Sequence, residues 1–413
     1  MKICGIVAEY NPFHNGHKYH IEKTKELTEC DAVVCVMSGN FIQRGLPALF
    51  DKWTRTKMAL ENGVDLVIEL PTFYATASAE YFARGAISLL DGLNVIDTLS
   101  FGNSCNDIEI LKRIANVLYL EPDGYKRELQ KEIKKGVSYP IARSKSLQTF
   151  LKKEINPKVL STVLLDSNNI LGIEYLKALL YCNSTITPVS VERKGGDYNS
   201  LHIDDNICSA TGIREMLFNN QLENVKSVMP ESSYEIVNNE ILNGKCPMFI
   251  NNFEKEIFYE LRRASISDLA NVVDVSEGLE NVMKKASNEC SNINELVETI
   301  KSKRYTKTRI QRLLIHSLLG IRKDENELYK HNPGYIRVLG FTKAGEKILS
   351  KISNKSNLPI VTSVSKFLKV ANETNKNMIE KDILATNIYN LGYQVPAYRK
   401  ANIDYTNEVC VIK

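Results

Sequence analysis

Residues 7–17 read Val7-Ala8-Glu9-Tyr10-Asn11-Pro12-Phe13-His14-Asn15-Gly16-His17. The apolar run Lys2–Val7 leads into this stretch and predicts a buried parallel strand. Helix formers dominate the segment that follows, Lys18–Leu27, and turn residues lie between the two. The pattern therefore predicts a strand, a tight turn and a helix. In open α/β sheets, ligands bind beyond the carboxyl ends of the strands, where a helix N-terminus can face a phosphate.

Two histidines, His14 and His17, flank Gly16 at this predicted strand-to-helix turn. Imidazole N–H groups can donate to phosphate oxygens, most favourably where a helix N-terminus also attracts negative charge. Gly16 has no side chain, so a nucleotide can approach the backbone closely. The chemistry indicated is nucleotidyl transfer, in which an acceptor oxygen attacks the α-phosphate of ATP and pyrophosphate leaves. We predict that His14 and His17 are catalytic; the alternative is a pair of surface histidines in a turn.

Further apolar runs alternate with helical segments along the first half of the chain, which predicts a parallel, right-handed α/β sheet. Beyond Pro230, strand-like runs become rare and charged helical sequence dominates. We predict a Rossmann-like parallel-sheet domain over 1–225, which binds the nucleotide, and a mainly helical domain over 226–413. The predicted strands of the first domain are 2–7, 31–37, 65–70, 95–101 and 187–191.

The chain has 413 residues, enough for two domains, and a formal net charge of only +4. This weak excess does not establish nucleic-acid binding, which must be argued from local clusters. Nine scattered cysteines without a Cys-x-x-Cys pair argue against a zinc ribbon or a disulfide framework, and no spacing of metal ligands is recognisable. We see no leader segment and no bilayer-spanning apolar stretch, so we expect a reducing, cytoplasmic setting.

The His-x-Gly-His pattern resembles the signature that nucleotidylyltransferases share with class I aminoacyl-tRNA synthetases. The longer stretch 8–17 resembles the tRNA(Met) cytidine acetate ligase family. The similarity runs across essentially the whole chain, and its linked motifs are more specific than His-x-Gly-His alone. Four further stretches are similar to the same family: VMSGNFIQRG at 36–45, GVDLVIELP at 63–71, NNILG at 168–172 and KRYT at 303–306.

This resemblance implies an ATP-dependent ligase with a nucleotidylyltransferase-like first domain and a tRNA-binding second domain. In such a ligase, acetate is activated as acetyl-adenylate and pyrophosphate is released. The acetyl group then passes to N4 of the wobble cytidine of elongator tRNA(Met). ATP and acetate would be substrates, and Mg²⁺ would come with the nucleotide phosphates rather than be held by a protein cage.

A second signature occurs later in the chain, at Ser209–Arg214. It resembles the superfamily's Ser-Ser-Thr-x-Ile-Arg at a helix N-terminus, with an alanine in the second serine position. Ser209 or Thr211 can cap this helix, while Arg214 and exposed main-chain N–H groups can hold the β- and γ-phosphates. Of the adjacent Asn168 and Asn169, we expect one to cap its helix and the other to reach the nucleotide. The ATP contacts that the resemblance implies are Val7, Ala8, Glu9, Tyr10, Asn11, Pro12, Phe13, His14, Asn15, Gly16, His17, Lys18, Tyr19, His20, Gly102, Asn168, Asn169, Arg193, Thr211 and Arg214.

The densest basic cluster lies in the second half of the chain, where six of the twelve residues in Lys301–Arg312 are cations. Apolar residues repeat at helical spacing behind them, so that one helix face is basic and the other faces the core. Such a helix is typical of binding to a nucleic-acid backbone, and the resemblance favours this function over a solvated basic face or cations paired with nearby glutamates. The expected tRNA contacts are Lys303, Arg304, Lys307, Arg309 and Arg312.

Two other functions remain open from the residues alone. One is a nucleotidylyltransferase that adenylates a small phosphorylated metabolite, and the large, locally basic second domain argues against it. The other is a non-catalytic RNA-binding protein with a degenerate nucleotide fold, and the intact pair of His14 and His17 argues against that. The oligomeric state is left open by the sequence.

Overall fold

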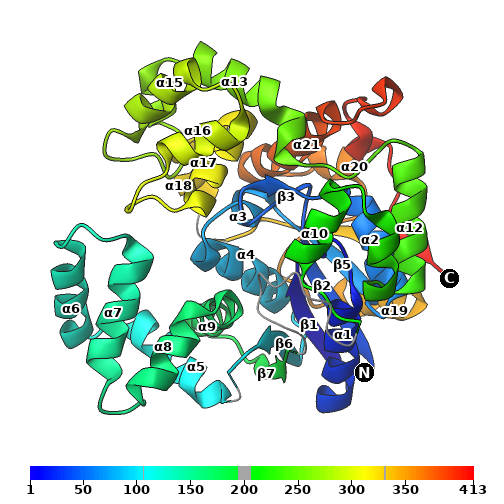
Figure 1. Cartoon of the computed structure of the whole chain (residues 1–413). Helices are drawn as coiled ribbons and strands as arrows, with labels where there is room; N and C mark the ends of the chain where they lie inside the picture. Colours follow the sequence, from blue (N-terminus) through cyan, green and yellow to red (C-terminus); the bar gives the residue numbers. More distant parts are fainter. Residues whose placement is uncertain (106, 194–205, 330–331) are drawn as a thin grey trace.

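The computed structural model describes residues 1–105, 107–193, 206–329 and 332–413, and an eight-stranded sheet forms its centre (Figure 1). The strand order is β10-β8-β5-β2-β1-β6-β7, with β9 beside β8. The run β5-β2-β1-β6-β7 is parallel throughout, which confirms the predicted α/β fold. The strands are β1 (Ile3–Ala8), β2 (Ala32–Ser38), β5 (Leu66–Leu70), β6 (Thr98–Asn103), β7 (Thr187–Glu192), β8 (Ile336–Thr342), β9 (Ile360–Val361) and β10 (Cys410–Ile412).

Strand β2 shows why the sheet is buried on both faces. Val34 and Val36 belong to one hydrophobic core, whereas Val33 and Cys35 belong to another. Successive side chains of a strand point to opposite faces, so a continuous apolar run fits a sheet that is covered on both sides. Helices α4 (Ala79–Gly92) and α9 (Ser167–Tyr181) contribute to the first core, and α1 (Asn15–Thr28), α2 (Lys52–Glu61) and α10 (Ala210–Phe218) to the second.

Between β6 and β7 the chain forms an arm of helices that lies beside the sheet (Figure 1). Two of its helices, α5 and α8, pack on α9, which leads back to the sheet. The arm places the N-terminus of α9 next to the carboxyl ends of β6 and β7. Its helices are α5 (Ile108–Leu120), α6 (Asp123–Ile133), α7 (Tyr139–Leu151) and α8 (Pro157–Leu165).

Residues 226–413 are mainly helical, as predicted, but they also complete the sheet. Strand β8 pairs antiparallel with β5, and β9 and β10 lie parallel to β8. The sheet therefore extends across residue 225, and a division into two domains at that point stays a prediction. The longer helices of this part are α12 (Glu231–Leu242), α13 (Glu254–Arg263), α15 (Leu279–Glu289), α16 (Ile293–Ile300), α17 (Lys307–Leu319), α19 (Lys343–Ile352) and α21 (Glu373–Leu391), with the short α14 (Ile266–Ala270) before α15.

A buried charge cluster joins the two parts of the chain. Lys52 Nζ lies 2.8 Å from Glu69 Oε1 and 2.7 Å from Asp404 Oδ1. Arg337 Nη2 lies 2.6 Å from the same oxygen of Asp404. The two cations and two carboxylates balance, and removal of one partner would leave a buried charge uncompensated, at a cost of about 3–5 kcal/mol. The cluster thereby fixes the last residues of the chain against the sheet.

Two short strands, β3 (Phe41–Ile42) and β4 (Leu46–Pro47), form a hairpin outside the main sheet. The hairpin follows β2 and turns at Gly45, whose φ of +71° lies in the left-handed region that suits glycine. A Cβ atom on Gly45 would lie 2.2 Å from the backbone N of Arg312. The hairpin thus packs directly on helix α17, and only glycine allows this approach.

Candidate active site

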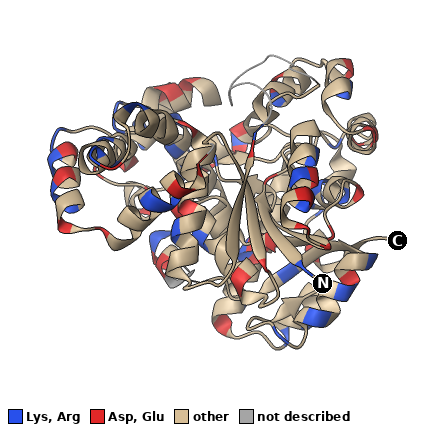
Figure 2. Cartoon of the chain, turned by 90° about the horizontal axis from the view of Figure 1, so that it is seen from below, with Lys and Arg blue, Asp and Glu red and all other residues tan. Residues whose placement is uncertain are grey.

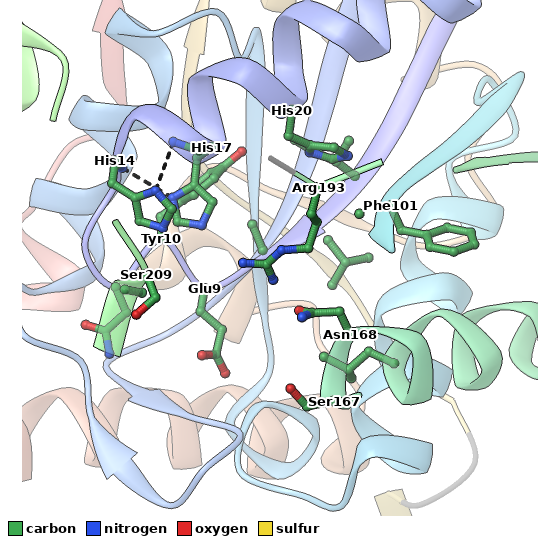
Figure 3. Close-up of a pocket in the computed structure, with 18 of the residues that line it drawn as sticks. Glu9, Tyr10, His14, His17, His20, Phe101, Ser167, Asn168, Arg193 and Ser209 are labelled. Carbon is green, nitrogen blue, oxygen red and sulfur yellow. Dashed lines mark hydrogen bonds between the residues drawn. The ribbon is translucent and has the colours of Figure 1, made fainter. Parts of the chain in front are cut away.

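A pocket of about 400 Å³ lies at the carboxyl ends of β1, β6 and β7 (Figure 3). The first turns of α1, α9, α10 and α17 reach its wall, with Gly16, Ser167, Ala210 and Thr308 among the lining residues. A helix N-terminus carries partial positive charge and unpaired N–H groups. Four such ends around one pocket favour an anionic ligand, such as the phosphates of a nucleotide.

The two predicted catalytic histidines lie side by side at the start of α1, with ring centroids 3.8 Å apart. His14 Nδ1 accepts a hydrogen bond from the Gly16 N–H at 3.1 Å, and His17 Nδ1 accepts one from the His14 N–H at 3.3 Å. Because both Nδ1 atoms accept, each neutral ring carries its proton on Nε2. His14 is only 5% exposed, so the alternative of a surface histidine in a turn is wrong for this residue.

Burial and nearby cations keep this pair neutral. Burial, together with the charges of Arg193 and Arg214, lowers the pKa of His14 to about 3. Burial, and then His14 and Arg193, holds the pKa of His17 well below its ordinary value. At neutral pH the pair therefore offers Nε2–H donors without carrying positive charge, and the positive charge of the site comes from the arginines.

Three arginines line the pocket and bring that charge: Arg44 of the β3–β4 hairpin, Arg193 and Arg214. Arg193 directly follows β7 and extends into the middle of the pocket (Figure 3). Gly102 of β6 leaves room for it, since a Cβ there would lie 3.3 Å from Arg193 Cγ. Arg214 donates from Nη1 to the Asn11 carbonyl at 3.0 Å and from Nη2 to Thr211 Oγ1 at 2.8 Å. Arg214 thus ties α10 to the turn after β1 while it adds charge to the pocket wall.

A third histidine, His20, lines the pocket one turn further along α1. Its Nε2 lies 3.1 Å from Ser100 Oγ, and that hydroxyl lies 2.6 Å from Thr24 Oγ1. Burial and the charge of Arg193 lower the pKa of His20 to about 4. The contact of His20 Nε2 with Ser100 therefore joins α1 to β6. This contact helps to position the helix that carries the catalytic pair.

The structure separates the two adjacent asparagines at the start of α9. Asp166 Oδ1 caps this helix by accepting the N–H groups of Asn168 at 2.7 Å and Asn169 at 3.1 Å, so the prediction that one of the asparagines is the cap is wrong. Asn169 is buried, and its Oδ1 accepts the Ser104 N–H at 3.0 Å. Asn168 lines the pocket (Figure 3). The amide available to a ligand is therefore that of Asn168.

Most of the predicted ATP contacts come together in the pocket wall. Others support it from outside: Phe13 is buried against the His17 ring, with centroids 5.5 Å apart, and Asn15 Nδ2 donates to the Ser227 carbonyl at 3.0 Å. Those that do not line the pocket are Pro12, Phe13, Asn15, Lys18, Asn169 and Thr211. Those that line it are Val7, Ala8, Glu9, Tyr10, Asn11, His14, Gly16, His17, Tyr19, His20, Gly102, Asn168, Arg193 and Arg214.

Sequence reasoning missed several lining residues, among them Phe101, Tyr175 and Thr308. Phe101 precedes Gly102 at the end of a predicted strand, so its position at the carboxyl edge of the sheet could have indicated it. Tyr175 lies two helical turns after Asn168, on the same face of α9. Thr308 comes from the other half of the chain, and nothing in the local sequence signals that it reaches this pocket.

The predicted tRNA contacts lie at and before the start of α17, and three of the five are paired within the protein. Arg304 Nη2 lies 2.7 Å from Glu277 Oε1, and Arg312 Nε lies 3.6 Å from Asp274 Oδ2. Arg309 Nη2 donates to the Asp274 carbonyl at 2.7 Å. These arginines therefore hold the loop between α14 and α15 against α17.

The other two predicted tRNA contacts, Lys303 and Lys307, are exposed. Within the described ranges, neither lysine forms an ion pair. In Figure 2, the ribbon segments of basic and acidic residues alternate along most helices, so the two lysines are a local feature rather than part of a uniformly basic face. Lys307 directly precedes Thr308, which lines the pocket.

Comparison with known proteins identifies the family. A family model described as HIGH Nucleotidyl Transferase matches residues 1–404. The tRNA(Met) cytidine acetate ligase of Acetivibrio thermocellus is 42% identical over 419 residues, which cover 100% of both chains. The ligase of the same name from Halothermothrix orenii is 44% identical and covers 98% of each chain. The chain belongs to the tRNA(Met) cytidine acetate ligase family.

Solved structures of this ligase family agree with the fold. The apo crystal structure of Thermotoga maritima TmcAL superimposes with a TM-score of 0.96 at 37% identity and covers 100% of both chains. A second structure, of the same protein bound with alpha-thio ATP, superimposes with a TM-score of 0.94 at 37% identity. The predicted family resemblance and the α/β fold with a mainly helical C-terminal part are thereby confirmed.

Proposed function

We propose that this chain is an ATP-dependent tRNA acetate ligase. It activates acetate as acetyl-adenylate, with release of pyrophosphate, and acetylates N4 of the wobble cytidine of elongator tRNA(Met). The observation that carries the proposal is the pair of neutral histidines, His14 and His17, with Nδ1 atoms held by backbone N–H groups and Nε2–H donors left for a ligand. Such donors, fixed before the reaction, suit a phosphate on which charge shifts during transfer.

In the activation step, an oxygen of acetate attacks the α-phosphorus of ATP, and the bond to the bridging oxygen of pyrophosphate breaks. The Nε2–H groups of His14 and His17 donate to the α-phosphate, and Arg193 offsets its charge. The N-terminus of α10, with Arg214 beside it, holds the β- and γ-phosphates. Gly102 and Asn168, which line the same pocket, contact the nucleoside in this proposal, and Mg²⁺ would come with the phosphates of the nucleotide.

The tRNA is held by Lys303 and Lys307, with the paired arginines of α17 as support. Because α17 also reaches the pocket wall through Thr308, a tRNA bound along this helix has its acceptor base close to the activated acetate. Within the described residues, no helix is both long enough and apolar enough to cross a bilayer. All nine cysteines are unpaired thiols, which supports the reducing, cytoplasmic setting that we propose for the protein.

The test is an acetylation assay with purified protein, ATP, labelled acetate and a transcript of elongator tRNA(Met), followed by nuclease digestion and identification of the labelled nucleoside. We expect label in N4-acetylcytidine, with ATP required. A matched transcript with uridine at the wobble position is the control and should take up no label. Label that appears equally in both transcripts, or none in either, would overturn the proposal.

A further inference from the structure

The pocket has two chemically different sides (Figure 3). His14, His17 and Ser209 lie on one side, with Arg193 in the middle. Glu9 lies away from the histidines, on the side of Ser167, and directly follows strand β1. A carboxylate repels phosphate oxygens, so the Glu9 side chain is poorly suited to the ATP contact predicted for it. The position of Glu9 therefore suits a ligand other than a phosphate.

Glu9 is held in place at both its main chain and its side chain. The Gln43 N–H donates to Glu9 Oε1 at 2.9 Å. Arg55, which is fully buried, donates from Nη1 to the Glu9 carbonyl at 2.6 Å and from Nη2 to the Ser38 carbonyl at 3.0 Å. Among the described residues, none donates a hydrogen bond to Glu9 Oε2. One carboxylate oxygen is therefore fixed, and the other is left for a ligand in the pocket.

The group that holds Glu9 is connected to the predicted RNA-binding helix. Gln43 lies in the β3–β4 hairpin, which packs on the backbone of α17 at Gly45. Thr308, in the first turn of α17, lines the same pocket. RNA bound on α17 would therefore deliver a base to the pocket that Glu9 lines.

We propose that Glu9 is the general base of the acyl-transfer step and that its side of the pocket receives a pyrimidine through its exocyclic amine. This inference rests on the proposed function. The amine nitrogen attacks the carbonyl carbon of acetyl-adenylate and forms the new C–N bond, and the bond from that carbon to the phosphate oxygen breaks to release AMP. The proton lost by the nitrogen passes to Glu9 Oε2 and then to solvent.

The chemistry of the acceptor requires such a base. The lone pair of an exocyclic amine on a pyrimidine is delocalised into the ring, so the nitrogen is a weak nucleophile until its proton is removed. A positioned general base contributes roughly 10²–10⁴-fold to a step of this kind. The activation step needs no base, because acetate is already ionised at neutral pH. The two half-reactions should therefore depend on Glu9 to very different extents.

The experiment compares wild type with Glu9→Gln, which keeps an oxygen to accept the Gln43 N–H but cannot take up a proton. Acetate-dependent exchange of pyrophosphate into ATP is measured in the presence of the tRNA transcript with uridine at the wobble position. Single-turnover acetyl transfer is measured with the normal transcript. We expect exchange to stay close to wild type and transfer to fall by roughly 10²–10⁴-fold. Hydroxylamine, a stronger nucleophile that needs no base, should trap the acetyl group equally well from both proteins.

Glu22→Gln is the matched control, since Glu22 is an exposed carboxylate of α1 that does not line the pocket. It should leave transfer close to wild type. Transfer unchanged in Glu9→Gln, or exchange reduced in parallel with transfer, would overturn the inference while the proposed function stands. Absence of transfer by the wild type would overturn both.

Discussion

The turn before α1 and the turn before α17 are both rich in polar side chains, but they leave different groups available to a ligand. At the first turn, the histidines use Nδ1 to hold the backbone of their own turn and keep Nε2–H for the pocket. At the second, Arg304 and two arginines of α17 bind a neighbouring loop, whereas Lys303 and Lys307 form no ion pair within the part of the chain that the structure describes. Local hydrogen bonds thus position the catalytic histidines at the first turn. At the second turn, such bonds occupy arginines that would otherwise be available to a ligand.

The largest effect is expected when the two histidines of the first turn are removed. The double variant His14→Ala/His17→Ala removes both Nε2–H donors, and each donor lost at such a site costs roughly 10²–10³-fold in turnover. Acetate activation should fall below detection in a pyrophosphate exchange assay. Affinity for tRNA, measured by fluorescence anisotropy, should stay unchanged because α17 is intact. A parallel loss of tRNA affinity would contradict the assignment of acetate activation to the first turn and of tRNA binding to the second.

The second-largest effect is expected in the dependence of the free energy of unfolding on pH. Folding lowers the pKa of His14, His17 and His20 below the unfolded value of 6.5, so the unfolded chain takes up protons first as the pH falls. The free energy of unfolding is therefore retained above pH 6.5 and decreases below it, by up to about 1.4 kcal/mol per pH unit for each histidine.

Urea denaturation from neutral pH down to about pH 5 checks this expectation. The variant His14→Asn keeps a good N-cap residue and removes one buried imidazole, so its stability should depend less steeply on pH. An identical slope in both proteins would show that the histidine at position 14 is not held neutral.

The third prediction compares the exposed lysines of the second turn with its paired arginine in tRNA binding. Lys303→Ala and Lys307→Ala should each reduce the slope of log K for tRNA binding against log salt concentration by roughly 0.7–1, since each lysine neutralises one phosphate. Arg304→Ala should reduce it less, because its guanidinium already pairs with Glu277. Binding isotherms of the three variants at several salt concentrations measure the slopes. Equal losses for all three would mean that tRNA displaces Glu277.

The smallest effects separate the two asparagines of α9. Asn169→Ala removes the acceptor of the Ser104 N–H and should lower the free energy of unfolding by about 0.5–1.5 kcal/mol. Asn168→Ala should instead weaken ATP binding by about 0.5–1.5 kcal/mol, seen as a raised KM for ATP with unchanged stability. Reversed results would place Asn169 at the nucleotide.

Much of this architecture could be predicted because the decisive signals are local. Buried strands appear as apolar runs, and the strand-to-helix turn with His14 and His17 is continuous in sequence. The contribution of β8 to the sheet could not be predicted, because its antiparallel pairing with β5 joins residues more than two hundred positions apart. The same holds for Thr308 in the pocket wall. The pairing of Arg304 with Glu277 agrees with the alternative of cations paired with nearby glutamates, but the sequence did not indicate which cations are paired. Asn168 and Asn169 are adjacent and have the same side chain, so the sequence could not show which of them faces the pocket.

The central claim is that the pocket between α1 and α10 activates acetate with ATP. The most direct measurement is exchange of labelled pyrophosphate into ATP by the purified protein, with and without acetate, before any RNA is added and again with bulk tRNA. We predict exchange that requires acetate and is lost in the variant that lacks both histidines. Exchange that proceeds equally without acetate, or none with any carboxylate even when tRNA is present, would contradict the account.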